Sequence, residues 1–545
     1  MSRRFAFAAA GVVASLVGCG RPAASPARPT GVPAVPAAVR EKLLDGAVSV
    51  LERLEQFDEA AAYGQVFDRL NQWSHARPGA AAAWAVDPLV ATLPEPLRAM
   101  ASEAALGSST FEASGDVTAL RDARWLADIA RQARAGVAPD DDLAAAVALF
   151  RWTVRSLAPV SDPPMVPTAS NPGSRWMLPG EILLAGRASA AQRAWIFLEL
   201  LRHAGLDGVM LATGDAASGP PRPWLPALVS GGEAYLFETA YGMPIPGPGG
   251  RGVATAREAA GDPTVLAALS LADRPYPVQA SDMARLTVLV AADPWCLSRR
   301  MADLETELGD TVGWRLVVAP TPLAERARAA LPGSVNIGMW AFPWETLARR
   351  GDKAALAAVL GRELAPLGVA FAERGGERAV RTGPRVVRPL MAARIREFRG
   401  DLDGSDGAKA SYLAARPSRQ VIAAAVAAAP PQQAESLQRL YDQMKEDATY
   451  WLGVLTLGEG EYAAAVDYLE RMTLAAAPDS RWADAARLNL AEAFMALGRE
   501  ADAEKLLRAD ASPQRFGSRL RADALAKRAA GPAEAEAGTK LNPGP

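Results

Sequence analysis

The sequence predicts a multidomain α+β protein that is helical at both ends. Its 545 residues are too many for one hydrophobic core, and a usual domain size of about 100 to 200 residues suggests three or four units. Helical and strand-like patterns alternate over residues 140–416, whereas residues 417–530 carry an internal helical repeat. Half of the residues are apolar and the formal net charge is -2, which argues against a disordered chain and against a nucleic-acid partner.

The first part of the chain, residues 1–19, has the features of a signal peptide. The basic start MSRR precedes an apolar run over residues 5–16, which is too short to cross a bilayer as a mature helix. The run leads into LVGC, ending at Cys19, which resembles the lipobox of bacterial lipoproteins. The resemblance implies cleavage before Cys19 and lipidation of its thiol, so that the chain is anchored in the bacterial cell envelope and faces the periplasm. Gly20 stands where an aspartate retains some lipoproteins at the inner membrane, which favours the outer membrane. The alternative is an ordinary secretory signal.

Two segments separate this signal from the α+β region. Residues 20–37 are rich in Pro and Ala without apolar periodicity, which predicts a semi-extended tether. Residues 38–139 predict a helical N-terminal region, because apolar side chains recur there at helical spacing. The recurring positions include Leu43, Ala47, Val50, Leu51, Leu54, Val66, Phe67 and Leu70.

The next region, residues 140–275, is built around one well-delimited helix. Ser189 followed three residues later by Gln192 is a capping-box pattern, so Ser189 is the expected N-cap and Ala190 the first helical residue. Gly205 lies where the helix is expected to stop. An earlier helix is expected over residues 143–157 and a strand over residues 233–237. The apolar stripe of the central helix consists of Ala194, Phe197, Leu198 and Leu201.

This segment, RASAAQRAWIFLELLRHAGLDGVMLATG, resembles the core of transglutaminase-like domains, which have a papain-like α+β fold. In that family a catalytic cysteine opens the helix, where exposed N–H groups and the macrodipole lower the thiol pKa. The family pattern places Ala190 at the cysteine position, Arg222 at the histidine position and Glu238 at the aspartate position. The resemblance therefore implies a degenerate site, because methyl and guanidinium groups provide neither a nucleophile nor a base.

The same resemblance implies a groove that could hold a ligand. Its lining would consist of Arg222, Trp224, Tyr235 and Glu238, with an ion pair between Arg222 and Glu238. No cofactor is predicted. A dedicated zinc site is not expected either, because the chain has only two histidines and two cysteines, although an all-carboxylate metal site stays open.

The alternative hypothesis is a cysteine or serine hydrolase, or a transglutaminase-like enzyme, that uses another nucleophile. Ser189 lies one residue from the expected position, but neither His75 nor His203 is placed in the sequence to act as its base, which favours a structural cap. Cys296 is the only thiol left once Cys19 is lipidated, so no intramolecular disulfide is expected. A small packed side chain is the favoured interpretation of Cys296, because no histidine neighbours it in sequence.

Residues 276–416 predict a small α/β region followed by a connector. Its expected strands and helices alternate, with strands over residues 285–290, 314–318 and 335–340 and helices over residues 297–308 and 323–330.

A glycine-centred pattern repeats near the C-terminus, at Gly460 and again at Gly498, 38 residues later. The first copy, with WLG before it and GEYAAA around it, resembles tetratricopeptide repeats (TPRs), in which small residues let two antiparallel helices pack closely. The resemblance implies a helical solenoid over residues 417–530 whose concave face binds a protein or peptide. Residues 531–545 predict a disordered tail. Taken together, these patterns predict a lipid-anchored, extracytoplasmic binding or scaffold protein with a catalytically inactive α+β domain.

Overall fold

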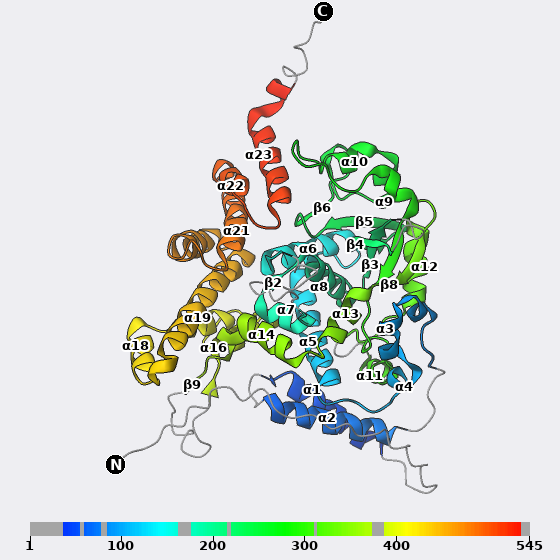
Figure 1. The fold of residues 1–545 in the computed structure, drawn as a ribbon, viewed down its shortest axis with the longest axis vertical. Coiled ribbons are helices and arrows are strands. Elements are labelled where there is room, and N and C mark those ends of the chain that lie inside the picture. The colour runs from blue at the N-terminus through cyan, green and yellow to red at the C-terminus, as the bar shows by residue number, and fades with distance from the viewer. Residues whose placement is uncertain are drawn as a thin grey trace, which may run out of the picture.

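The structure, a computed structural model, describes residues 36–54, 59–77, 84–161, 176–214, 220–309, 313–372 and 386–535. A six-stranded sheet lies on one side of the molecule and a tall stack of helices on the other (Figure 1). The predicted signal peptide with Cys19, and the tether up to residue 35, lie outside the described residues. Among the helices that are described, none is long and apolar enough to cross a membrane.

The predicted N-terminal helical region is helical, but it does not form a unit of its own. Helix α1 (Ala37–Leu51) packs against α2 (Glu59–Ala76), and both contact α5 (Gly115–Ala133). Because α5 also packs against helices at residues 142–156, 179–185, 190–203 and 389–399, it ties this region into the main body. Short helices link α2 to α5, namely η2 (Pro88–Thr92), α3 (Glu95–Arg98), η3 (Ala99–Ala101) and α4 (Glu103–Leu106).

The predicted α+β region combines helices with a set of antiparallel strands. Helices α6 (Asp142–Ser156), α7 (Pro179–Ala185) and α8 (Ala190–His203) lie together, and α6 and α8 contact the sheet. Strands of the sheet follow in antiparallel order, as β3 (Asp207–Thr213), β4 (Arg222–Ser230), β5 (Glu233–Glu238) and β6 (Met243–Pro244). A separate parallel pair joins β1 (Ala158–Pro159) to β2 (Arg187–Ala188), just before α8.

The sheet continues across the boundary predicted at residue 275. Strand β7 (Thr287–Val290) pairs antiparallel with β3, and β8 (Asn336–Met339) pairs parallel with β7, which gives the order β6-β5-β4-β3-β7-β8. The division into two domains at this point is therefore wrong. Since the free edge of β3 is buried, its backbone groups need a partner strand, and β7 provides it.

The expected strand over residues 314–318 is also wrong. The N–H of Val317 donates to the carboxylate of Glu305 at 2.9 Å, and the N–H of Leu316 donates to the same carboxylate. These backbone groups are therefore satisfied by a side chain instead of by a strand.

Helices cover the second face of the sheet and connect it to the C-terminal stack. The elements on the sheet are α9 (Ala256–Gly261), η5 (Ala280–Arg285) and α12 (Pro320–Ala330), with α10 (Pro263–Ala267) packed on α9 and η4 (Pro248–Gly250) on α10. The remaining elements before the stack are α11 (Arg299–Leu308), α13 (Ala341–Arg349), α14 (Lys353–Leu364), η7 (Ala365–Gly368), β9 (Phe371–Ala372), β10 (Val386–Val387), α16 (Pro389–Arg399) and α17 (Ala408–Ala414).

The two copies of the sequence repeat in the C-terminal stack have the same turn geometry. Gly460 and Gly498 both have a positive φ, 80° and 73°, and each ends a helix. The N–H of the following residue then reaches back five positions, from Glu461 to Thr456 at 2.9 Å and from Arg499 to Phe494 at 2.8 Å. The helices of the stack are α18 (Arg419–Ala427), α19 (Pro431–Gly458), α20 (Tyr462–Val466) with its π-helical continuation η8 (Asp467–Leu474), α21 (Ala483–Ala496), α22 (Glu500–Arg508) and α23 (Arg515–Ala535). Helix α23 runs past the expected end of the repeats at residue 530.

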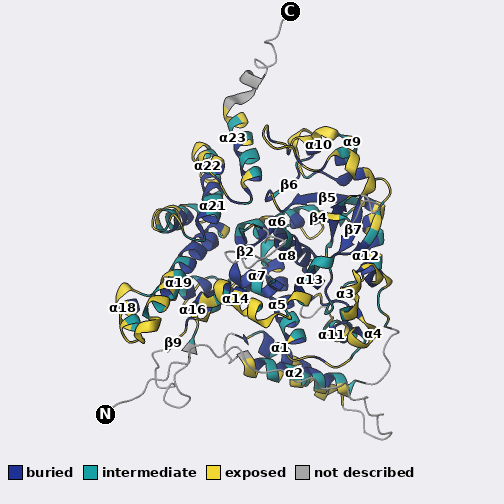
Figure 2. Ribbon diagram, viewed as in Figure 1, coloured by how far each residue is buried: buried dark blue, intermediate teal, exposed yellow. Residues whose placement is uncertain are grey.

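One hydrophobic core joins the stack to the sheet. It contains Phe197 of α8 and Phe237 of β5 together with Trp451 and Trp482 of the stack. A second core lies on the opposite face of the sheet, beneath α9 and α12. In Figure 2 the helices α19 and α21 are dark blue where they face the body of the molecule. The stack therefore shares a hydrophobic core with α8 and β5.

Candidate functional site

The N-terminus of α8 has the cap that the sequence predicts. Oγ of Ser189 accepts a hydrogen bond from the N–H of Gln192 at 3.4 Å, and Oε1 of Gln192 accepts one from the N–H of Ser189 at 3.1 Å. Ser189 is buried, and His203 closes the opposite end of the same helix, where its Nδ1 accepts from the N–H of Arg315. No base among the described side chains is bonded to Ser189, and its hydroxyl serves as a cap.

The C-terminal stack covers this end of α8. A Cβ atom added to Gly186 would lie 1.9 Å from Cζ2 of Trp451, so the two elements are in close contact. Nε of Arg193 donates to the carbonyl of Leu157 at 3.0 Å, and Nη1 of Arg193 donates to Oε1 of Gln514 at 2.5 Å. Ala190, half-buried, lies one turn before Arg193. The helix end that would carry a nucleophile is thus engaged in packing between two parts of the chain.

Glu238, at the predicted acid position, is buried at the end of β5. It accepts hydrogen bonds from the hydroxyl of Tyr276 and from the N–H of Ala240, the latter at 2.9 Å, and Tyr276 in turn accepts from Nε1 of Trp224 at 2.8 Å. Burial raises the pKa of Glu238, and the bond from Tyr276 opposes that rise. The carboxylate of Glu238 therefore holds Tyr276 by a hydrogen bond at the end of β5.

The sheet places Trp224 and Glu238 on the face opposite α8. Leu225 pairs with Leu211, but Pro223 pairs with the next residue, so Trp224 is the extra residue of a β-bulge. Trp224 consequently packs into the core on the far face, together with Tyr276. Since side chains alternate along a strand, Glu238 lies on the same face as Leu236, which belongs to that core.

The residues expected to line one groove are therefore divided between the two faces. Tyr235 packs into the core on the α8 face, whereas Trp224 and Glu238 face the other way. Arg222 is exposed at the start of β4, and within the described parts of the chain it makes no ion pair with Glu238. No hydrogen bond or ion pair among the described residues joins Ala190, Arg222 and Glu238. Among the described residues, the expected ion pair is not formed, and the side chains expected to line one groove lie on two faces of the sheet.

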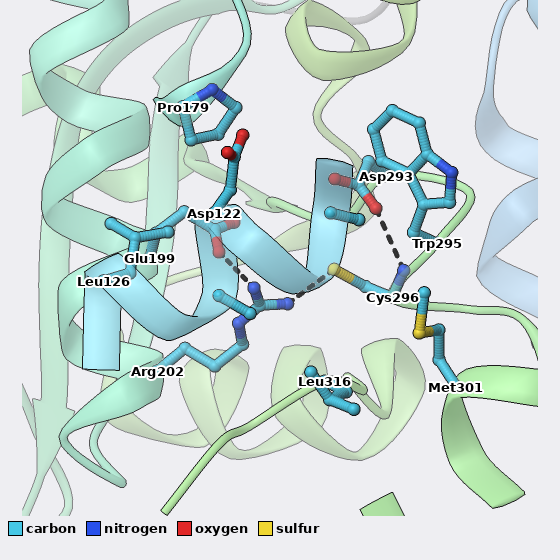
Figure 3. A pocket seen from close by; sticks show the side chains of 12 residues that line it. Asp122, Leu126, Pro179, Glu199, Arg202, Asp293, Trp295, Cys296, Met301 and Leu316 are labelled. Atoms are coloured by element: carbon cyan, nitrogen blue, oxygen red, sulfur yellow. Dashed lines mark hydrogen bonds and ion pairs between the residues drawn. The ribbon is translucent and has the colours of Figure 1, made fainter. Parts of the chain in front are cut away.

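Cys296 lines a small cavity between α5, α8 and the segment after β7 (Figure 3). Its Sγ lies 2.5 Å from Nη1 of Arg202, and its N–H donates to Oδ1 of Asp293 at 2.9 Å. Arg202 also forms an ion pair with Glu199. The cavity has a volume of about 30 Å³, which is the space of about one water molecule and too small for an organic substrate.

The electrostatics of this cavity oppose nucleophilic chemistry. Burial raises the pKa of the Cys296 thiol well above its usual value, with Arg202 acting in the opposite direction and Asp293 and Glu199 adding to the rise. Burial also raises the pKa of Glu199 to about 7, against the lowering effect of Arg202. Burial lowers the pKa of His203 well below its usual value. Buried contacts among four side chains therefore connect α8 to the loop before α11, namely Glu199, Arg202, Asp293 and Cys296.

The inner face of the helical stack is occupied by the chain's own body. Nδ2 of Asn489 on α21 donates to the backbone carbonyl of Arg155 at 3.2 Å and to the hydroxyl of Tyr450 at 3.1 Å. The outer helices of the stack are different, since Ala501 and Lys505 of α22 and its C-cap residue Ala509 are exposed. The outer helices are therefore accessible to a partner, whereas the inner face is covered by the body of the molecule.

Chain position alone did not indicate the residues that close this face. Gln514 follows the second predicted repeat and belongs to no motif, and Arg193 is a single charged position in α8. The available sequence signal for Arg193 is its place directly before the apolar stripe that begins at Ala194. Among the described residues, no group of three or more His, Cys, Asp or Glu side chains is placed to hold a metal ion.

Comparison with known proteins identifies the C-terminal repeats. Residues 456–527 match the family model of the tetratricopeptide repeat. The match runs from the end of α19 to α23 and includes both turn glycines, Gly460 and Gly498. Repeats of this family indicate protein–protein interaction or a scaffold role. The chain matches no curated protein and no solved structure.

Proposed function

We propose that the protein is a lipid-anchored binding or scaffold protein of the bacterial envelope, which holds a protein or peptide partner through its C-terminal repeats. The observation that carries this proposal is the repeat match over residues 456–527. The anchor is the lipidated Cys19, and the body faces the periplasm, with the outer membrane favoured. These last points rest on the signal and LVGC pattern of the sequence.

The proposed binding surface is the outer side of the stack, formed by η8 and α22. Helix α22 exposes Ala501 and Lys505, and its C-cap residue Ala509 is exposed as well, whereas α21 faces the body of the molecule. Helix α21 contacts α6, so this side of the repeats is covered and a partner would bind the opposite side.

The α+β region is proposed to be a catalytically inactive domain similar to transglutaminase-like domains. The order of elements, a capped helix followed by antiparallel strands, agrees with that resemblance. Three observations support inactivity. Ala190 has no nucleophilic atom, the hydroxyl of Ser189 is used as a cap, and the thiol pKa of Cys296 is raised. We propose that the role of this domain is structural, namely to pack against the repeats and hold them in position.

The partner surface can be tested with a photoreactive amino acid placed at Ala501 of α22. A matched control carries the same amino acid at Ala267 of α10, another exposed alanine, on a helix that lies across the molecule from α22 (Figure 1). Irradiation of cells should give one discrete crosslinked species for position 501 and none for position 267. The same crosslinks at both positions, or none at either, would count against a partner on the outer helices.

The anchor can be tested separately by labelling cells with a clickable fatty acid. The wild-type chain should carry the label and partition with membranes, whereas Cys19→Ser should do neither. A wild-type chain that remains unlabelled would overturn lipidation at Cys19 and leave the repeat surface to its own test.

A further inference from the structure

A small cavity lies where α5 and α8 meet the segment between β7 and α11 (Figure 3). Its volume is about 30 Å³, whereas roughly 10 to 15 Å³ is enough for one water molecule. Cavities that stay empty in proteins are apolar, whereas a cavity with several polar partners holds ordered water. The charged side chains that line this cavity are Asp122 from α5, Glu199 and Arg202 from α8, and Asp293 from the segment after β7.

Asp293 has few partners for a buried carboxylate. Its Oδ1 accepts a hydrogen bond from the N–H of Cys296 at 2.9 Å, and the residue is only 9% exposed. Within the parts of the chain that the structure describes, Asp293 makes no ion pair and no second hydrogen bond. A carboxylate can accept about four hydrogen bonds, and an acceptor that is buried without a donor is destabilising. Asp293 therefore needs a donor that the described residues do not provide.

Arg202 has the opposite excess on the same cavity. Its Nη2 forms an ion pair with Glu199, and its Nη1 lies 2.5 Å from Sγ of Cys296, which is a weak acceptor. Among the described residues, Nε of Arg202 is buried and has no hydrogen-bond partner, and no direct bond joins Arg202 to Asp293. A spare donor and a spare acceptor therefore line one cavity that has room for a molecule of about the size of water.

We propose that this cavity is a binding site for one ordered water molecule, which accepts a hydrogen bond from Arg202 and donates one to Asp293. Water suits both roles because it donates and accepts, and a buried water makes about three hydrogen bonds. The carboxylate of Glu199 is a third polar neighbour on the cavity wall. A bridging water is nearly as favourable in enthalpy as a direct hydrogen bond. The water connects α8 to the loop before α11, and the site is independent of the function proposed above.

A crystal structure of the protein tests the site directly. At a resolution that shows ordered waters, one peak of electron density should lie in the cavity within hydrogen-bond distance of both Arg202 and Asp293. A cavity without such a peak, or a direct bond between Arg202 and Asp293, would overturn the proposal. This measurement uses the wild-type chain and does not depend on the folding of any variant.

Two pairs of variants on α5 give an independent test in solution. Ala123 lines the cavity, whereas Ala130 of the same helix lies in an apolar core. Threonine and valine have nearly the same shape and are both branched at Cβ, but one carries a hydroxyl where the other carries a methyl group. The comparison of threonine with valine at each position therefore isolates the effect of a polar atom.

The order of the Tm values distinguishes a hydrated cavity from a dry one. At Ala123 the threonine hydroxyl takes the place of the water, so Ala123→Thr should have a Tm at least equal to that of Ala123→Val. At Ala130 the order should be reversed, with Ala130→Val higher by roughly 1 to 3 °C, because the hydroxyl is buried among apolar groups there. A preference for valine by the same margin at both positions would show that the cavity is dry and would overturn the proposal.

Discussion

Arg193 and Gln514 are 321 positions apart in the sequence and share a buried hydrogen bond of 2.5 Å. Arg193 also donates to the carbonyl of Leu157 from its Nε at 3.0 Å and from Nη2. The side chain of Arg193, in the first turn of α8, thus bonds to Leu157 at the end of α6 and to Gln514 in the segment before α23. The end of α8 that in a thiol enzyme would be open to substrate is here a junction of three parts of the chain.

Loss of this junction should destabilise the whole molecule. Arg193→Met leaves the carbonyl of Leu157 and the amide of Gln514 without their donor, which should lower the free energy of unfolding by about 2 to 4 kcal/mol. Urea denaturation measures this change. The control Arg326→Met removes an exposed ion pair with Asp207 and should cost no more than about 1 kcal/mol. Equal effects of the two variants would show that the junction contributes little.

A methyl group at Gly186 should separate the stack from the α+β region. Gly186 has φ 61°, and its added Cβ would lie 1.9 Å from Cζ2 of Trp451, so Gly186→Ala should cost more than about 3 kcal/mol. Gly205→Ala is the control, because Gly205 has φ 79° but no atom within 4 Å of its added Cβ. It should cost only about 1 to 2 kcal/mol for the left-handed backbone. Similar Tm values for both variants would contradict the close packing of Trp451.

Stability should fall with rising pH because of Glu199. Burial raises its pKa from 4.5 to about 7, so between these values the folded state binds more proton than the unfolded state. The favourable contribution is complete below pH 4.5 and is lost as the pH rises through about 7. Glu199→Gln cannot ionise, so its Tm relative to the wild type should increase from pH 5 to pH 8. A pH-independent difference between the two proteins would refute the raised pKa. The other buried carboxyls are common to both and do not affect the comparison.

Cys296 should react with thiol reagents only when the protein unfolds. In a chain that begins at Gly20 it is the only thiol, it is 5% exposed, and burial raises its pKa well above the usual value. The labelling rate should therefore follow the opening of the structure across a urea series. Cys296→Ala should give no signal. Fast labelling in native buffer, which would indicate an activated thiol, would reopen the enzyme hypothesis.

Local patterns were sufficient for most of the helices and for the repeat. Helix caps and glycine turns depend on residues within one or two helical turns, so the local sequence predicts their geometry. This holds for the cap at Ser189, the stop at Gly205 and the turns at Gly460 and Gly498. The same holds for the strand at residues 233–237, whose alternation is local. The strand expected at residues 314–318 was wrong because Glu305, on another element, satisfies its N–H groups.

The sequence by itself determined the capped helix α8, the absence of a nucleophile at Ala190 and the helical repeats near the C-terminus. Only the tertiary structure decided that β7 completes the sheet of β3, that a bulge at Trp224 directs this side chain and Glu238 to the face opposite α8, and that Gln514 reaches Arg193. The physical reason is that strand pairing, bulges and buried hydrogen bonds satisfy backbone and side-chain groups across long separations. Hydrophobic periodicity reports which face of an element is buried, but it carries no information about which distant residue covers that face.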